Sequence, residues 1–239
     1  MLKFIGLEFH KIKRTTMYLI IISLSVLPVL MILLQYLVSN DSEKEFYTTV
    51  ASNNIVITMC LYTVAIILAN FIITREYQDR TIIYLFITPQ SRKKILASKF
   101  GLLFILLFSL GAFTYGSILI LNMIFGGVDG DVAAKMIGAW FSGVILFFLL
   151  MPFIVLIALW RKNFISSMLI SLVLVIFTTP FMFTENIYMF PHLIPMAVSN
   201  NLLRINNKLD INYPVAFIIL AVVFVSCSLL SMKLFNRKE

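Results

Sequence analysis

The sequence predicts an all-α integral membrane protein with six transmembrane helices, and two observations carry this prediction. First, 61% of the 239 residues are apolar and only 13% are charged, about half of the ~25% that is usual in soluble domains. A soluble chain of this size has too little interior for so many apolar side chains. Second, the apolar residues fall into six stretches, each close to the ~20 residues that a helix needs to cross the hydrocarbon core.

The six predicted spans contain no Asp, Glu, His, Lys or Arg. They cover residues 17–38, 53–74, 100–125, 136–159, 164–183 and 213–232, and the whole chain, 1–239, is interpreted as a single transmembrane domain. Ion-coupled transporters usually carry ionisable groups at membrane depth, so we expect any transport through this chain to draw its energy from another source. The spans also lack the paired aspartates or Ser–His pair of an intramembrane protease, and an enzyme is not expected.

Polar groups within the spans are few, and two interpretations of them stay open. The favoured one is hydrogen bonding between helices, worth about 1 kcal/mol each, and the other is the lining of a substrate path. The groups in question are Gln35, Asn70, Ser109, Thr114 and Asn122. Small residues four positions apart indicate close helix packing, and the pairs are Ala112 with Gly116 and Ala139 with Gly143.

The distribution of basic residues predicts that both termini are cytoplasmic. One side of the membrane receives residues 1–16, 75–99, 160–163 and 233–239, with 15 Lys/Arg and 4 Asp/Glu. The other side receives residues 39–52, 126–135 and 184–212, with 4 Lys/Arg and 7 Asp/Glu. The more basic side of a membrane protein is the cytoplasmic one. Topology and anionic lipid head groups therefore account for the net charge of +8, and no nucleic-acid partner is expected.

Two segments outside the spans are predicted to lie at the membrane surfaces. Residues 1–16 place apolar side chains at helical spacing among lysines, which favours a helix lying in the cytoplasmic interface. The external segment 184–212 contains Pro191 and Pro195 among apolar residues, with Pro214 just beyond it. We expect short helices here that are broken by the prolines and partly folded into the outer leaflet.

The longest cytoplasmic loop, residues 75–99, reads REYQDRTIIYLFITPQSRKKILASK. Thr81 follows a charged group and can begin a helix, the apolar run 82–87 is too short to cross a membrane, and Pro89 stops it. A positive-inside linker would explain the lysines of this loop. It would not explain an apolar helix beside mixed charges, which a docking element for a cytoplasmic partner does explain.

The order of residues in this loop resembles that of the membrane subunits of ABC-2-type ATP-binding-cassette exporters. The matching pattern is Glu76-Tyr77, then Thr81, Pro89, Ser91-Arg92 and Lys99, although Arg80 stands where the family often has Gly. The resemblance implies a coupling helix in this loop that contacts a cytoplasmic ATPase subunit, with Arg92 and Lys99 anchoring the return to the membrane. The docking residues implied are Arg75, Glu76, Tyr77, Asp79, Arg80, Thr81, Pro89, Arg92 and Lys99.

The resemblance also sets the expected partners. No GxxxxGK[ST] phosphate loop and no metal-ligand cluster occur in the sequence, so ATP and Mg are expected in the partner ATPase and no cofactor in this chain. A second permease chain, identical or not, is implied. In lacking a large external domain, the chain is similar to exporters of bacteriocins and amphipathic peptide toxins in the bacterial plasma membrane. Alternatives are the same architecture with a drug, a lipid-linked sugar or sodium as cargo, or a membrane scaffold or sensor that transports nothing.

Overall fold

The described part of the chain is helical throughout and contains no strand. The computed structural model describes all residues except 1–5, 7–8, 10–14, 16, 39–45, 80–91, 128, 184, 204–210 and 237–239. Six helices are long and apolar enough to cross a membrane, which confirms the predicted fold class. They are α2 (Met17–Val38), α3 (Phe46–Gln78), α5 (Arg92–Phe125), α6 (Gly130–Arg161), α7 (Phe164–Thr178, extended by the 3₁₀ turn η1, Thr179–Phe183) and α9 (Tyr213–Asn236).

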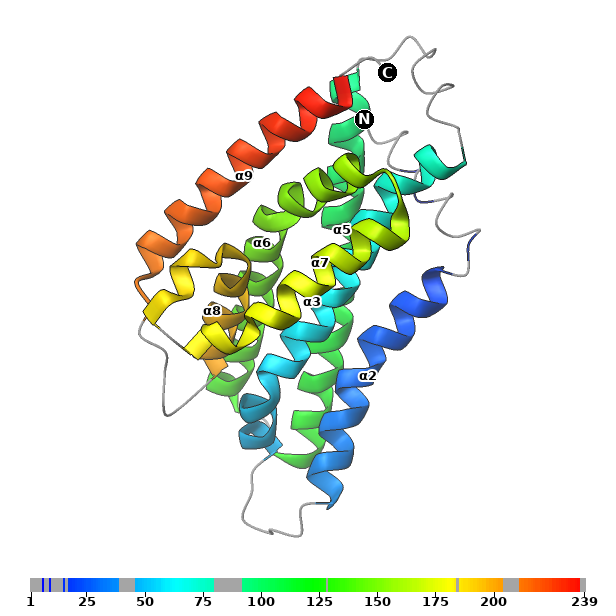
Figure 1. Ribbon diagram of the computed structural model, residues 1–239. Coiled ribbons are helices and arrows are strands. Elements are labelled where there is room, and N and C mark those ends of the chain that lie inside the picture. The colour runs from blue at the N-terminus through cyan, green and yellow to red at the C-terminus, as the bar shows by residue number, and fades with distance from the viewer. Residues whose placement is uncertain are drawn as a thin grey trace.

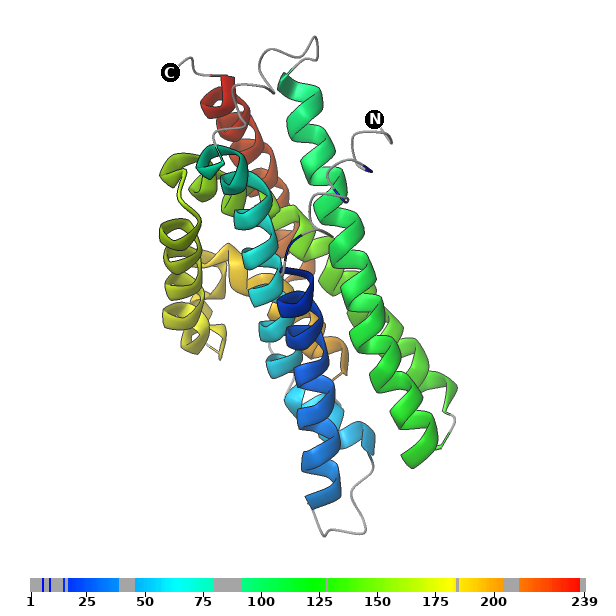
Figure 2. The same cartoon turned by 90° about the vertical axis from the view of Figure 1, so that its right-hand side faces the viewer.

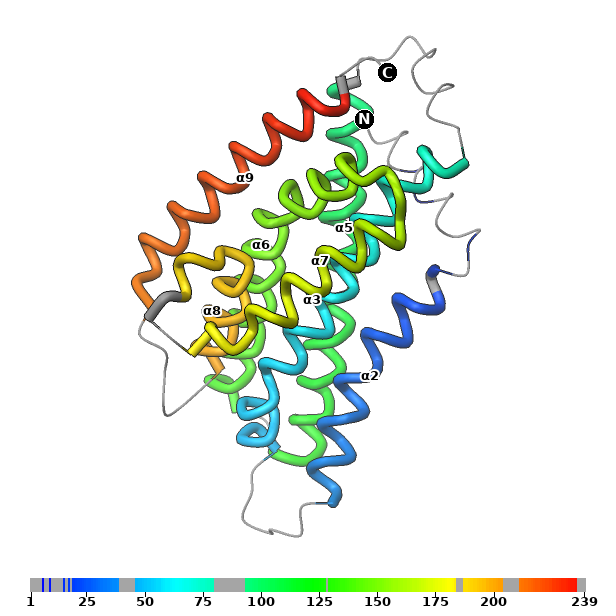
Figure 3. The backbone as a smooth tube through the Cα atoms, in the orientation of Figure 1, coloured from blue at the N-terminus to red at the C-terminus, as the bar shows by residue number. Residues whose placement is uncertain are grey.

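Successive spans run in opposite directions, so the molecule has two ends (Figure 1, Figure 2). At the end that we call the basic end, α3 ends, α5 begins, α6 turns into α7, and α9 ends (Figure 1). Its described basic residues are Arg75, Lys93, Lys94, Lys99, Arg161, Lys162 and Lys233. At the opposite end, the segment between α7 and α9 folds against the bundle, and we call it the α8 end (Figure 3).

Helices α3 and α6 form the centre of the bundle. In each of them 56% of the most apolar stretch is buried, against 17–33% in the other four spans. α2 and α5 contact α3 on one side, whereas α9 lies along α6. The outer faces of α2, α7 and α9 expose large apolar side chains, including Leu34, Phe177 and Leu229. In a bundle of membrane spans such faces meet lipid.

α2 covers the predicted span 17–38, whereas other helices extend beyond their predicted spans. α3, α5 and α6 are longer than the predicted spans 53–74, 100–125 and 136–159. The hydropathy pattern detects only the part of a helix that crosses hydrocarbon. The backbone hydrogen bonds continue past it, because polar side chains tolerate the head-group region. The fifth span is interrupted instead: α7 ends at Thr178 and η1 follows, with Pro180 lacking the N–H that another α-helical turn requires.

The predicted short helices of the external segment are present. They are η1, η2 (Glu185–Met189), η3 (Pro191–Leu193) and α8 (Ile194–Leu203). Each proline starts a helix rather than breaking one, since Pro191 begins η3 and Pro195 is the second residue of α8. α8 packs against the spans: nine of its residues are buried, and it contacts α6 and α3. Its depth in the outer leaflet stays a prediction. The predicted interfacial helix over 1–16 lies almost entirely outside the described residues.

A cluster of neutral polar groups joins α8 to the centre of the bundle. Tyr115 on α5 donates to Oδ1 of Asn54 on α3 at 2.9 Å and lies 3.2 Å from the Ser199 hydroxyl on α8. Ser199 in turn donates to the carbonyl of Ala139 on α6 at 3.4 Å. Gly143, one turn further along α6, would place a Cβ 3.9 Å from the same hydroxyl. A Cβ at that distance would make an ordinary van der Waals contact. We call Asn54, Tyr115, Ser199 and the Ala139 carbonyl the α8 cluster.

The polar residues that were expected to bond between helices mostly do not. Asn70 donates to the carbonyl of Ile66 and Ser109 to that of Leu106, each within its own helix. Thr114 donates to Leu110 in the same way and also reaches the Ser25 carbonyl of α2 at 3.4 Å. The carbonyls of the preceding turn are always within reach of such side chains, so these donors are satisfied locally, whereas Oδ1 of Asn70 and Oδ1 of Asn122 are buried without a partner in the described structure.

Candidate coupling site

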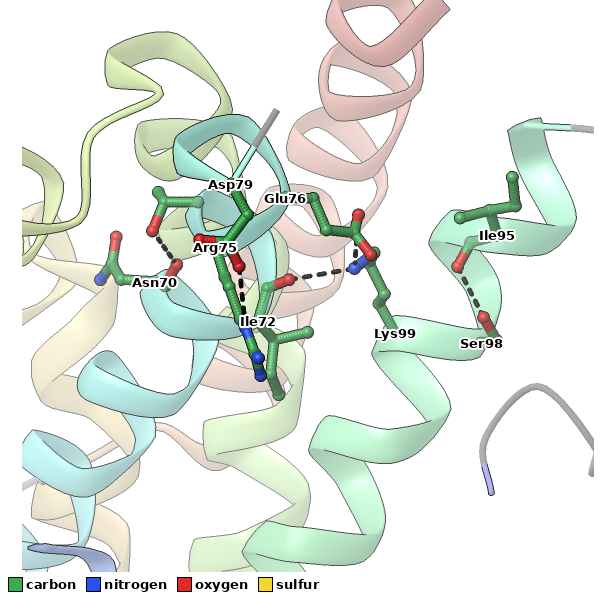
Figure 4. Close-up of polar contacts among 9 residues, drawn as sticks. Asn70, Ile72, Arg75, Glu76, Asp79, Ile95, Ser98 and Lys99 are labelled. Atoms are coloured by element: carbon green, nitrogen blue, oxygen red, sulfur yellow. Dashed lines mark hydrogen bonds and ion pairs between the residues drawn. The ribbon is translucent and has the colours of Figure 1, made fainter. Parts of the chain in front are cut away.

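The two helices that frame the predicted docking loop are joined by a buried ion pair. Nζ of Lys99, on the second turn of α5, lies 2.9 Å from Oε2 of Glu76 on the last turn of α3. It also donates to the carbonyl of Ile72 at 3.0 Å. Figure 4 shows the Lys99 side chain extending from α5 toward the end of α3. We call Glu76, Lys99 and the Ile72 carbonyl the ionic clamp.

The clamp lies inside the protein, where its two charges depend on each other. The side chains of Lys99 and Glu76 are only 1% and 5% exposed, and apolar residues such as Ile73, Leu96 and Leu103 belong to the surrounding core. Removing one member of a buried pair leaves an uncompensated charge, which typically costs about 3–5 kcal/mol. The ammonium group also binds the Ile72 carbonyl, which lies more than one turn before the end of α3. The ends of α3 and α5 are thus held together.

The last turn of α3 also carries an exposed pair, Arg75 and Asp79. Nε of Arg75 lies 3.2 Å from Oδ2 of Asp79, and both side chains are substantially exposed. The guanidinium also lies 5.5 Å from the centre of the Phe71 ring. An exposed i,i+4 pair of this kind contributes only about 0.3–0.5 kcal/mol to stability. The pair therefore adds little to the stability of this helix end, which the buried clamp beside it holds (Figure 4).

The turn between α6 and α7 lies beside the same end of α3, which the sequence did not indicate. Lys162, with φ of +52°, ends α6, and its Nζ lies 5.8 Å from the centre of the Tyr77 ring. Asn163 begins α7 by accepting hydrogen bonds from Ile165 and Ser166. The only sequence signal was that 160–163 belongs to the basic side. These contacts add Lys162 to the candidate site.

The structure divides the predicted docking residues into three groups. Arg75, Tyr77 and Asp79 lie on the accessible last turns of α3. Glu76 and Lys99 lie inside, so their carboxylate and ammonium groups face each other and not the surface. The others are at or beyond the edge of the described residues: Arg80, Thr81 and Pro89 lie outside them, and at Arg92 only the start of α5 is described. The docking role of the whole set stays a prediction.

The sequence was next compared with known families. The model of the family described as ABC-2 family transporter protein matches residues 4–178, which is 175 of the 239 residues. The chain belongs to this ABC-2 transporter family. It is accordingly a multi-pass permease subunit of an ABC transporter, a class of transport subunits that work with an ABC ATPase. A comparison with curated proteins gives no significant match.

The matched region of this ABC-2 permease contains the ionic clamp, the Arg75–Asp79 pair and the α6–α7 turn. It ends at the last residue of α7. The 3₁₀ turns, α8 and α9 lie beyond it. The family assignment therefore rests on the part of the chain that holds the candidate coupling site, and the α8 end has to be interpreted from its own contacts.

Proposed function

We propose that this permease exports amphipathic peptides from the cytoplasm or inner leaflet, driven by a separate ATPase that docks on the 75–99 loop. In this proposal the basic end is cytoplasmic, the membrane is the bacterial plasma membrane, and two permease chains enclose the path. ATP and Mg act in the ATPase. The chain forms a single permease domain, and its part is to convert movement of the docking loop into movement of its helices.

The observation that carries the proposal is the ionic clamp. The docking loop follows α3 and precedes α5 in the sequence, and the clamp ties the end of α3 to the beginning of α5. A push on the loop would therefore move both helices as a unit. The same α3 carries Asn54 of the α8 cluster at its other end. A displacement of α3 would thus reach α8 at the opposite side of the bundle.

Two features support a peptide as the cargo. The outer faces of the spans are apolar, so an amphipathic molecule can reach the bundle from within the membrane. Asn200 on α8 is fully buried, and neither polar atom of its amide has a partner in the described structure. An amide both donates and accepts, as a peptide bond requires of a partner. Sodium would instead favour several oxygen ligands, and a lipid-linked sugar would need many polar groups.

The test measures ATP turnover of the permease co-purified with its ATPase and titrated with an amphipathic peptide. Asp79→Lys and Arg75→Glu place the wrong charge on the docking surface without touching the clamp. Asp131→Lys is the matched control, because Asp131 is also an exposed acid but begins α6 at the α8 end.

Saturable stimulation by peptide that is lost in Asp79→Lys and kept in Asp131→Lys would support the proposal. A stable complex that ignores peptides but responds to a drug, a sugar lipid or sodium would replace the cargo and keep the docking site. If the permease bound the ATPase but no cargo stimulated ATP turnover, the interpretation as a scaffold or sensor would be favoured. Normal coupling in both loop variants would refute the docking surface.

A further inference from the structure

An apolar recess of about 250 Å³ lies at the α8 end, between two membrane spans. α6 forms one wall and α9 the other, and the start of α8 closes the back. The residues around it include Ser142, Leu146, Ile194, Val198, Ala216 and Phe217. Among the residues that the structure describes, no charged side chain lines it, and the polar groups that do are the hydroxyls of Ser142 and Tyr213.

The recess opens onto the surface that faces lipid. Ile145 and Phe217, which line it, are both exposed on the outside of the bundle, as is Ile218 beside them. Tyr213 is the first residue of α9 and lies at the rim. Tyrosine at the end of a span is typical of the membrane–water interface. The recess therefore begins near the head groups and extends along the hydrocarbon part of α6 and α9.

We infer that this recess binds one acyl chain of a membrane lipid. The walls offer water few hydrogen-bonding partners, since the Ser142 hydroxyl already donates to the carbonyl of Ala139, and an apolar cavity excludes water. Its volume lies below the ~300–1,000 Å³ of pockets that enclose drug-sized ligands, which suits part of a flexible hydrocarbon chain. The walls are continuous with the lipid-facing surface of a multi-pass protein, so acyl chains are the apolar groups present at its opening. This inference does not depend on the proposed cargo.

The bound chain would also hold α8 in place. Val198 faces the recess, and the next residue, Ser199, belongs to the α8 cluster and points about 100° away around the helix. An acyl chain in the recess would thus support α8 from the lipid side, while Asn54 and Tyr115 bind it from the protein side. Without the acyl chain, only the polar contacts on the protein side would hold α8.

The experiment uses the purified full chain in vesicles of phosphatidylcholine and phosphatidylglycerol that contain a phosphatidylcholine with a photoreactive diazirine in its acyl chain. After illumination, the adducts are mapped by mass spectrometry. The exposed face of α2, with Leu27, Leu30 and Leu34, reports ordinary lipid contact. Ser142→Leu fills the recess, and Ser226→Leu is the matched control on the exposed face of α9.

We expect more adducts on the recess residues than on α2, and loss of that excess in Ser142→Leu but not in Ser226→Leu. Equal labelling of the recess and α2 would overturn the inference, and so would an excess that Ser142→Leu leaves unchanged. Disulfide crosslinking of two permease chains through a Phe217→Cys variant would also overturn it, since a second copy would then cover the recess. The comparison of the recess with α2 needs only the unaltered chain, so it decides the question even if Ser142→Leu fails to fold.

Discussion

At the basic end a pair of opposite charges joins α3 to α5, whereas at the α8 end neutral amide, phenol and hydroxyl groups join α8 to three other helices. Both sets are buried, and both include a residue of α3. Glu76 and Asn54 are 22 positions apart, roughly 33 Å along a helix at 1.5 Å per residue. That distance is comparable to the ~30 Å of the hydrocarbon core, so the two sets lie toward opposite sides of the membrane. The basic end thus uses a charged pair and the α8 end uses neutral hydrogen bonds.

The largest expected effect comes from breaking the ionic clamp. Lys99→Met should lower the free energy of unfolding by about 3–5 kcal/mol, because Glu76 then stays buried without its counter-charge. Thermal or denaturant unfolding in detergent would measure this. The matched control is Lys93→Met, which removes an exposed lysine one and a half turns earlier in α5 and should change stability little.

A second variant distinguishes the lost pair from lost packing. Glu76→Gln combined with Lys99→Met removes both charges and should recover most of the stability that Lys99→Met alone loses. If Lys99→Met were as stable as Lys93→Met, the clamp would not hold α3 and α5 together, and the contrast between the two ends would fail.

A smaller effect is expected from acid at the α8 end. His192 is buried beneath α7 and forms a hydrogen bond with Thr178, and burial lowers its pKa to about 4. The unfolded chain has the ordinary pKa of about 6.5, so below pH 6.5 protons bind the unfolded state first. Stability should therefore be complete above pH 6.5 and fall by on the order of 2 kcal/mol as the pH approaches 4.

Unfolding curves between pH 4 and 7 test this, with His192→Gln as the variant that removes the titrating group. The chain has one other histidine, His10, and His10→Gln serves as the control. His192→Gln should flatten the pH dependence relative to His10→Gln. Identical pH profiles would mean that His192 is not buried in its neutral form, and the α8 end would be more open to water than the structure indicates.

The neutral cluster should be weaker than the clamp when one member is removed. Tyr115→Phe deletes the donor to Asn54 and the contact to Ser199, and we expect a loss of about 1–2 kcal/mol. Tyr213→Phe, at an exposed phenol, is the control. A loss as large as that of Lys99→Met would show that the hydrogen bonds of the α8 end act cooperatively and would remove the distinction between the two ends.

The sequence predicts the membrane fold well because apolar length is a local property. Six runs without charges lead directly to six spans, and the prolines mark where the short helices near α8 begin. Contacts between distant residues are not local. Glu76 and Lys99 were both singled out, but their pairing depends on α3 and α5 lying side by side. Asn54, Tyr115 and Ser199 were not predicted from the sequence. The local sequence around each of them looks like that around Asn70 or Ser109, whose side chains bond only within their own helix.

The smallest expected effect on stability comes from substituting Asp79. This substitution also separates an effect on the folded structure most clearly from an effect on coupling to the ATPase. Its pair with Arg75 is exposed, so Asp79→Asn should cost no more than about 0.5 kcal/mol. If the last turn of α3 docks the ATPase, the same change should still lower peptide-stimulated ATP turnover, because a partner that excludes water strengthens a charge contact. Unfolding and turnover measured on one preparation, with Asp131→Asn as control, compare the two effects. If Asp79→Asn lost stability and turnover in the same ratio as Lys99→Met does, Asp79 would support the helix end and would not contact the ATPase.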